Sequence, residues 1–320
     1  MAEMRAIRWV AVLVAIVAAG AGVPALSGAK IHVRAYTAGI VGALPLIRMQ
    51  EADLLGAEAD LEVIVSPDHQ RGLSLLTSGE VDLLITAVNV GALAHNKGLE
   101  LQLMNVNIWG IDYLLTYGFR ADNWQDLTER TLSLPLKGGP LDFLVRYLAR
   151  KSGTDVDDLM VVYRPLPQGA IYFQTGKLDA IVIPEPLVSV TLQKTPDAVL
   201  SMDIQEEWAT FHGGDRRIPF VGLFVSSHFV REHAELAGEV SRLYLEGAEW
   251  VNQYPDDASV MAEEWLKLPA PIFKTSLTRT DFQAVPAQLV KDNVCGYLEE
   301  ILEMYPDLVG GKVPDETFFY

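Results

Sequence analysis

The sequence predicts an α/β protein made of two lobes, and three observations predict it. Segments with the spacing of strands and of helices alternate along the chain, the succession restarts after Gly118, and a short unit recurs once in each block. Such alternation favours a parallel sheet covered by helices on both faces. With 320 residues, half of them hydrophobic, the chain is long enough to bury one large or two medium cores.

In the first block, strands are expected at residues 30–36, 59–67 and 81–88, with one or two more between 99 and 118. Helices are expected from Gly42 and over 69–80 and 89–98; the last two end at Gly79 and Gly98. In the second block, strands are expected at 131–136, 158–166 and 178–186, and helices over 140–153 and 168–177.

The recurring unit is SGEVDLLIT at residues 78–86 and TGKLDAIVI at 175–183, in which a glycine shortly precedes a strand that opens with an aspartate. An apolar strand is then expected at 220–227, and everything from residue 228 onward has the spacing of helices. With Gly118 and Ile218 as approximate crossing points, we expect lobe one to comprise residues 30–117 and 218–320 and lobe two to comprise 118–217.

The first 29 residues have a different character. Arg5 and Arg8 precede an apolar run at 9–19, and small residues follow up to Ala29. This pattern predicts a secretory signal peptide over 1–29, cleaved near Ala29, and therefore a periplasmic mature protein. A membrane anchor is the alternative, but the run is shorter than the roughly 20 apolar residues that span a bilayer.

Composition and motifs argue against several functions. A formal charge of −17 without clustered Lys and Arg excludes a typical nucleic-acid-binding surface. Cys295 is the only cysteine, so one chain cannot form a disulfide or a thiolate metal cluster. Zinc-protease, nucleophile-elbow and phosphate-loop motifs are missing from the sequence. We therefore expect a protein that is not an enzyme, with no catalytic residue, no metal and no cofactor.

Three segments carry a resemblance to a known family: residues 75–98, 138–186 and 224–258. They resemble the periplasmic solute-binding proteins of ABC importers for nitrate, sulfonates, taurine and thiamine precursors. The resemblance implies the type II periplasmic-binding-protein fold, with two lobes and a two-stranded hinge. It also implies a small-molecule ligand in the cleft between the lobes, a membrane permease and ATPase as partners, and a monomer.

The turn before the helix at 140–153 is the first candidate binding element, with Lys137, Gly138 and Gly139 just ahead of Pro140. Backbone amides at a helix start lack intrahelical partners and favour an anionic or carbonyl oxygen, and glycines allow close approach. The alternative is a plain turn with a solvated lysine. The resemblance favours the ligand role, because in this family the turn faces the cleft.

The other candidates follow the ends of expected strands, where the loops of an α/β protein meet a ligand. An aromatic ring can stack on a planar solute, although a core position is the more usual place for a tryptophan. For Glu185 a hinge brace is an open alternative, and for Asn89 a simple helix cap. These candidates are Tyr36, Thr37, Gly39, Gln70, Arg71, Asn89, Trp109, Gln168 and Glu185.

The function that these expectations support is capture of a small organic solute, anionic or carbonyl-bearing, for delivery to an importer. Two alternatives stay open: a binding protein for thiamine-pyrimidine precursors, and an enzyme built on the same fold.

Overall fold

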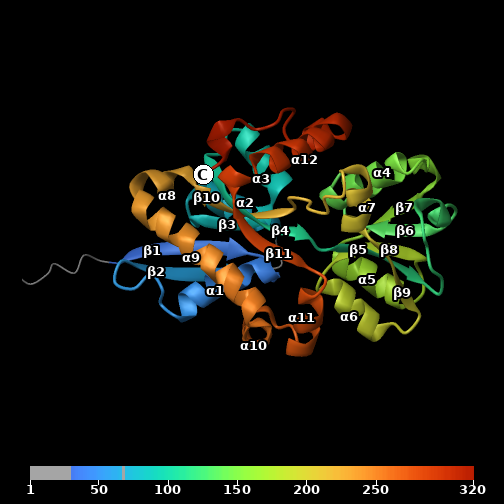
Figure 1. Cartoon of the computed structure of the whole chain (residues 1–320), viewed down its shortest axis with the longest axis horizontal. Coiled ribbons are helices and arrows are strands. Elements are labelled where there is room, and N and C mark those ends of the chain that lie inside the picture. The colour runs from blue at the N-terminus through green and yellow to red at the C-terminus, as the bar shows by residue number, and fades with distance from the viewer. Residues whose placement is uncertain (1–29, 67–68) are drawn as a thin grey trace, which may run out of the picture.

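The computed structural model describes residues 30–66 and 69–320, which fold into two α/β lobes (Figure 1). The expected signal peptide, residues 1–29, lies outside the described residues. We call the part built on the first sheet lobe one and the part built on the second sheet lobe two. The prediction of two α/β lobes is confirmed.

Lobe one has a six-stranded sheet in the order β11-β4-β10-β3-β1-β2. Its strands are β1 (Ile31–Thr37), β2 (Ala59–Val65), β3 (Leu83–Ala87), β4 (Leu101–Gly110), β10 (Val221–Ser226) and β11 (Asp281–Pro286). Its helices are α1 (Leu44–Glu51), α2 (His69–Ser78), α3 (Val88–Asn96), α8 (Ser227–Glu232), α9 (Ala234–Gln253), α10 (Pro255–Leu266), α11 (Ala270–Leu277) and α12 (Lys291–Met304).

Lobe two has a five-stranded sheet in the order β7-β6-β8-β5-β9. Its strands are β5 (Asp112–Tyr117), β6 (Thr131–Leu134), β7 (Met160–Tyr163), β8 (Ala180–Pro184) and β9 (Ala198–Asp203). Its helices are α4 (Pro140–Lys151), α5 (Leu166–Gln174), α6 (Leu187–Lys194) and α7 (Ile204–Phe211).

The sheets are mixed, which differs from the expected all-parallel arrangement. β1, β2 and β3 run parallel, as do β6, β7 and β8, whereas β10 and β5 run antiparallel to their neighbours. The reason is that β5 and β10 are the strands with which the chain enters each lobe from the other one. The strand β11 was also missed, because its short sequence DFQAVP lies within a region of helical spacing.

The chain first crosses between the lobes at Ile111, earlier than the expected Gly118, because β5 belongs to the second sheet. It returns through the segment before β10, where the amides of Ile218 and Phe220 donate to the carbonyls of Trp109 and Ile108. The two crossings therefore run side by side as a two-stranded hinge. The expected return at Ile218 falls on this segment.

The recurring sequence unit has the same structural role in both lobes. The carboxylate of Asp82 accepts from the amide of Arg34 in β1 at 2.9 Å, and that of Asp179 accepts from the amide of Thr131 in β6 at 2.8 Å. Gly79 and Gly176 just upstream both have a positive φ, of 72° and 67°, which glycine adopts at little cost. Each unit thus ends a helix and ties the next strand to its parallel neighbour.

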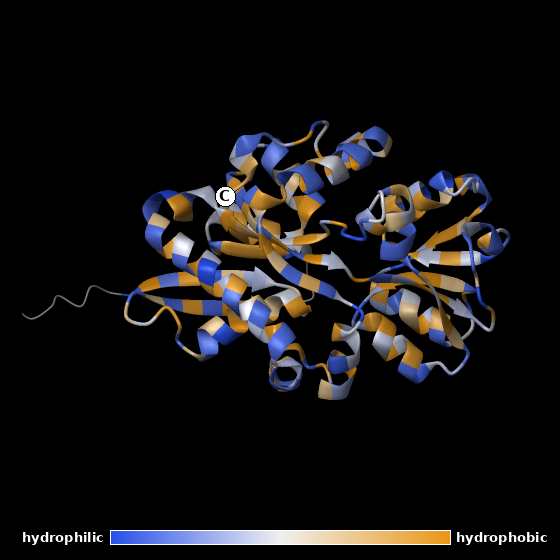
Figure 2. Cartoon of the chain, viewed as in Figure 1, coloured by the Kyte–Doolittle hydropathy of each residue, from blue (hydrophilic) through white to orange (hydrophobic). Residues whose placement is uncertain are grey.

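Buried hydrophobic side chains pack between the sheets and the helices in both lobes. Figure 2 shows that many residues of the strands are hydrophobic. In lobe one, α1, α9 and α10 cover one face of the sheet, and α2, α3 and α12 cover the other. In lobe two, α4 and α7 lie on one face and α5 and α6 on the other. The core beneath α2, α3 and α12 continues into the core beneath α4 and α7, so the lobes share buried apolar surface.

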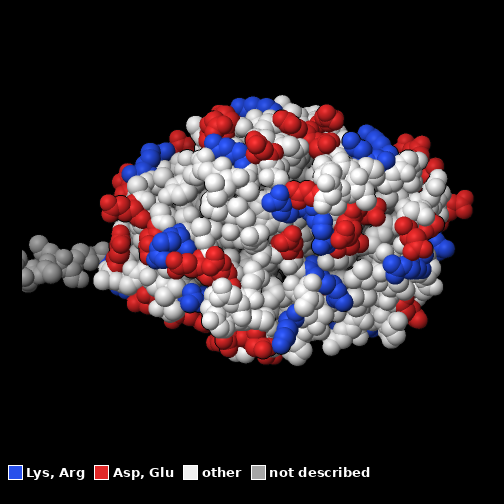
Figure 3. All heavy atoms as spheres, viewed as in Figure 1, with Lys and Arg blue, Asp and Glu red and all other residues white. Residues whose placement is uncertain are grey.

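Acidic and basic side chains are scattered over the visible surface, with acidic groups in excess, as the net charge requires (Figure 3). Within residues 30–66 and 69–320, every helix is too short or too polar to cross a membrane. The same part of the chain contains no cluster of three or more His, Cys, Asp or Glu side chains suited to a metal ion.

Candidate ligand-binding cleft

Strand direction determines which loops lie between the lobes. β4 runs toward the first crossing; β3 and β1 run the same way, because β3 and β4 both pair antiparallel with β10. In lobe two, β8 runs against the incoming β5, so β8 and its parallel neighbours β6 and β7 end toward lobe one. The carboxyl ends of the parallel strands of the two lobes therefore face each other, which is where α/β proteins bind ligands.

The loop after β1 meets the loop after β8 at one end of this space. Gly39, Ile40 and Val41 of lobe one line a narrow crevice together with Glu185 and Pro186 of lobe two. Two of the expected site residues, Gly39 and Glu185, are thus brought together across the lobes. Thr37 lies just before this loop and is fully buried; its hydroxyl donates to the carbonyl of Ala38 at 2.9 Å.

Asn89 is the expected residue of lobe one that offers an unused polar atom. It stands in the first turn of α3, directly after β3, and is only 2% exposed. Its Oδ1 has no hydrogen-bond partner among the described residues. The N-cap position belongs to Ala87, whose side chain makes no capping bond, so Asn89 is not the helix cap. A buried acceptor without a partner costs free energy unless another group donates to it.

The remaining candidates of the first lobe differ in accessibility. Tyr36 is buried beneath α2, where a Cβ on Gly72 would come within 2.9 Å of its ring, so its ring packs in the core rather than at the cleft edge. Arg71 is exposed. The side chain of Gln70 lies outside the part of the chain that the structure describes.

Trp109 packs within the hinge, whereas we expected its ring to stack on a ligand. Its ring is 1% exposed, and its indole Nε1 donates to the carbonyl of Gln283 in β11 at 2.8 Å. The guanidinium of Arg217, from the returning segment, lies 5.8 Å from the ring centroid. These contacts tie β4 to both neighbouring segments, and the ring is not free to hold a solute.

The glycine turn before α4 satisfies its own amides. Gly138 donates its amide to the carboxylate of Asp142 at 2.8 Å, and Gly139 donates to the carbonyl of Leu136 at 3.1 Å. Asp142 is almost fully buried and also accepts from Arg146 and from the hydroxyl of Tyr163, both at 2.9 Å. The two amides are therefore already used in this structure, contrary to our expectation that they meet a ligand.

Lys137 projects from this turn and is exposed, beside the equally exposed Leu136. At the start of α5, Gln168 is also exposed. Gly169 is buried, and a Cβ there would lie 3.1 Å from the hydroxyl oxygen of Ser133. Gly169 thus serves the close packing of α5 on the sheet, while Lys137 and Gln168 are the expected site residues of lobe two whose side chains are exposed.

Glu185 acts as a brace. Although only 1% exposed, its carboxylate is well bonded: it accepts from the amide of Ser189 at 3.0 Å and from its hydroxyl at 2.9 Å. Arg279, at the end of α11, donates to the same carboxylate at 3.3 Å and to the Ser189 hydroxyl at 3.2 Å. The carboxylate therefore joins the start of α6 in lobe two to α11, and the brace alternative is the one that these contacts support.

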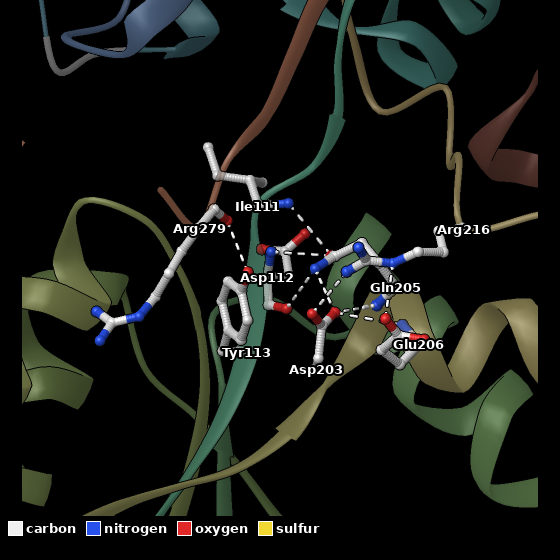
Figure 4. A network of polar contacts seen from close by, with 8 residues as sticks. All are labelled: Ile111, Asp112, Tyr113, Asp203, Gln205, Glu206, Arg216 and Arg279. Atoms are coloured by element: carbon white, nitrogen blue, oxygen red, sulfur yellow. Dashed lines mark hydrogen bonds and ion pairs between the residues drawn. The ribbon is translucent and has the colours of Figure 1, made fainter. Parts of the chain in front are cut away.

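A polar network surrounds the first crossing (Figure 4). The side-chain Oε1 of Gln205 accepts from the amides of Ile111 and Asp112, and its Nε2 donates to Asp203 at 2.7 Å and to the carbonyl of Asp112 at 3.3 Å. On the other side of the strand, the hydroxyl of Tyr113 donates to the carbonyl of Arg279 at 2.7 Å. The crossing is thus clamped by α7 on one side and by the end of α11 on the other.

Sequence reasoning missed this network. Gln205 follows the N-cap Asp203 of α7, and Arg279 lies in a helical region far from the crossing in sequence. Asp203 bonds Arg216 at 2.9 Å, and Arg216 also meets Glu206 at 3.0 Å. No local pattern connects these residues, because the three chain segments meet only in the folded state.

The comparisons with known proteins agree with this architecture. No family model matches the sequence, and no curated protein matches it significantly. Among solved structures, an ABC transporter protein from Parabacteroides distasonis is similar, with 18% identity and a TM-score of 0.76 over 91% of this chain and 99% of that one.

Two further similar structures carry more specific names. The periplasmic aliphatic sulphonate binding protein SsuA from Escherichia coli has 16% identity and a TM-score of 0.74, over 90% of this chain and 92% of that one. The periplasmic nitrate-binding protein NrtA from Synechocystis has 14% identity and a TM-score of 0.66, over 88% and 84%. At such identities the likeness shows the fold: the chain has the generic periplasmic binding protein fold, as expected.

Proposed function

We propose that the chain is the extracytoplasmic substrate-binding component of an ABC importer, which captures a small organic solute between its lobes and delivers it to the permease. The observation that carries this proposal is the opposition of the strand ends of two lobes across a two-stranded hinge. Such a hinge lets a solute bind one lobe first and gain contacts from the other on closure, so that binding stabilises the closed form.

The solute contacts that we propose come from residues in the loops and helix starts that follow the parallel strands. In lobe one, the unpartnered Oδ1 of Asn89 would accept from an N–H or O–H group of the solute. In lobe two, Lys137 and Gln168 would contact the solute from the opposite side. Arg71 and Gln70 stay candidates at the edge of lobe one. Tyr36, Thr37, Trp109 and Glu185 would support the site from behind.

The chemistry of these side chains indicates the class of solute. A lysine and an arginine at the edges suit an anionic group, and a buried amide oxygen suits a donor on the same molecule. The two similar structures named for aliphatic sulphonates and for nitrate bring those anions into the set of candidates. A zwitterionic or hydroxylated sulfonate or carboxylate would satisfy both requirements.

Location and partners complete the proposal. Residues 1–29 would direct secretion and be cleaved near Ala29, which gives a monomeric periplasmic protein that works with a membrane permease and its ATPase. N-terminal mass spectrometry of the protein recovered from the periplasm tests the cleavage. An intact N-terminus in a cytoplasmic fraction would contradict it.

A thermal-shift screen of the mature protein tests the function. The candidates are nitrate, taurine, alkanesulfonates, bicarbonate, dicarboxylates and thiamine-pyrimidine precursors. A solute at 100 times its Kd stabilises the folded state by about 2.7 kcal/mol, which a melting curve resolves. We expect Asn89→Ala to weaken the response to the solute that binds. If no solute shifts the transition and the protein instead converts a substrate, the transport proposal is wrong.

A further inference from the structure

Asp112 is a buried acid at the junction of the lobes, and one of its carboxyl oxygens has no hydrogen-bond partner in the described part of the chain. It is the first residue of β5, directly after the crossing at Ile111, and is 2% exposed. Its backbone amide and carbonyl are held by Gln205, but its carboxyl Oδ1 has no hydrogen-bond partner among the described residues. The side chain is therefore almost fully withdrawn from solvent at the point where the chain enters lobe two.

Tyr297 approaches this acid from the other lobe. It belongs to α12 of lobe one, yet its ring packs edge-on against Phe143 and Trp208 of lobe two, with centroids 6.2 and 6.0 Å away. The residue is 2% exposed, and its hydroxyl also lacks a partner within the described part of the chain. Burial raises the pKa of this hydroxyl, and a negative charge on Asp112 would raise it further, so the two groups lie within electrostatic reach of each other.

The surroundings of Asp112 favour its neutral form. Burial raises its pKa to about 8, and the second cause is the negative charge of Asp203 in β9. Asp203 is itself paired with Arg216, and α7 offers only the neutral Gln205. The other group that faces it is Tyr297 of α12, which is uncharged at neutral pH. No cation among the described residues contributes to the pKa of Asp112.

We propose that Asp112 binds a proton when the lobes pack together over it and releases that proton to water when they part, so that protons favour the closed arrangement. The inference rests on the hinged opening in the proposed function. Tyr297 borders a surface hollow of about 400 Å³ together with Trp208, so a displacement of α12 from lobe two would let water reach the acid. The proton comes from solvent and returns to it, and no other chemistry is involved.

The direction of the pH effect follows from proton linkage. With its carboxyl exposed to water in an open form, Asp112 would have its ordinary pKa of about 3.9. Between about pH 4 and pH 8, the closed form therefore holds a proton that the open form lacks, and closing becomes less favourable as the pH rises. The closed-to-open ratio would fall by up to about tenfold per pH unit within that window and stay level above it.

Small-angle X-ray scattering of the solute-free mature protein between pH 5 and pH 9 tests the inference. We expect the radius of gyration to increase with pH in the wild type and to be insensitive to pH in Asp112→Asn, which mimics the protonated acid. Asp60→Asn, which removes a carboxylate of β2 that is 57% exposed, is the control and should keep the wild-type response.

Infrared difference spectra provide a second readout that does not depend on lobe motion. The wild type at pH 6 should show the carbonyl stretch of a protonated carboxylic acid, and Asp112→Asn should lack that band. A wild type without a pH response, or an Asp112→Asn variant that keeps it, would overturn the inference. The scattering and infrared experiments use no solute. If no solute bound the protein in the thermal-shift screen, that result would count against the proposed function and not against this inference.

Discussion

Replacing Asp142 with alanine would test the way in which the chain builds the glycine turn before α4. This carboxylate is 1% exposed and accepts three hydrogen bonds, from the Gly138 amide, from Arg146 and from the hydroxyl of Tyr163. Truncation would leave the Gly138 amide without its acceptor. It would also leave the Arg146 guanidinium, whose side chain is only 18% exposed, without its carboxylate and with the Tyr163 hydroxyl alone. The turn and the edge strand β7, which carries Tyr163, would loosen together.

The magnitude follows from these contacts. Removing one partner of a buried ion pair costs about 3–5 kcal/mol, and the partial exposure of Arg146 reduces this to about 2–4 kcal/mol. At roughly 2 °C per kcal/mol for a chain of this size, the melting temperature should fall by about 4–8 °C. Asp142→Asn keeps the shape and one acceptor, so its cost should be smaller, about 1–3 kcal/mol.

Urea unfolding followed by tryptophan fluorescence measures these free energies. Asp60→Asn is the matched control, because Asp60 is 57% exposed and its ion pair with Lys30 is a surface contact that water screens. If Asp142→Ala cost no more than Asp60→Asn, the buried carboxylate would not organise the turn. The Gly138 amide would then again be a candidate to meet a ligand.

The remaining predictions concern the hinge, the brace and the cleft. Gly110→Ala should destabilise the protein by about 1–3 kcal/mol in urea unfolding, because the new Cβ would lie 2.4 Å from Cγ of Gln205. An unchanged unfolding midpoint would mean that Gln205 does not clamp the crossing. Arg279→Met should lower the free energy of unfolding by about 1–3 kcal/mol and increase the radius of gyration in X-ray scattering, because it removes the hydrogen-bond donor that links α11 to the buried Glu185. An unchanged radius of gyration would show that this brace does not set the angle between the lobes. Lys137→Met should leave stability within about 0.5 kcal/mol and weaken an anionic solute several-fold in calorimetry, whereas Lys97→Met, at the far end of α3, should leave binding unchanged.

The α/β lobes could be predicted because the sequence features that specify their strands and helices are local. The period of the apolar residues, the glycines that end helices and the repeated Gly-x-Val/Leu-Asp unit each act over a few residues, and Asp82 and Asp179 occupy equivalent positions in the two sheets. The mixed direction of the sheets could not be predicted in this way. It depends on which lobe the chain comes from when it forms β5 and β10, and strand periodicity carries no such information.

The candidate site shows the same limit. Helix-start chemistry marked the turn at 137–139 as a place where amides lack partners within the helix, but the carboxylate of Asp142, four residues after Gly138, accepts from the Gly138 amide. Trp109 and Glu185 were candidates because they lie near the ends of strands, and the structure places both residues there. Their side chains nevertheless turn toward β11 and toward α11, segments more than ninety residues away in sequence.

The sequence by itself thus determined the class of fold, the positions of most strands and helices and the loops that border the cleft, since these depend on neighbours along the chain. Only the tertiary structure decided which polar groups in those loops are already bonded and which, like Asn89, remain unused. It also placed Asp112 opposite Tyr297 at the lobe junction. The physical reason is that hydrogen bonding and burial depend on distances between segments, and those distances exist only once the two lobes have packed around the hinge.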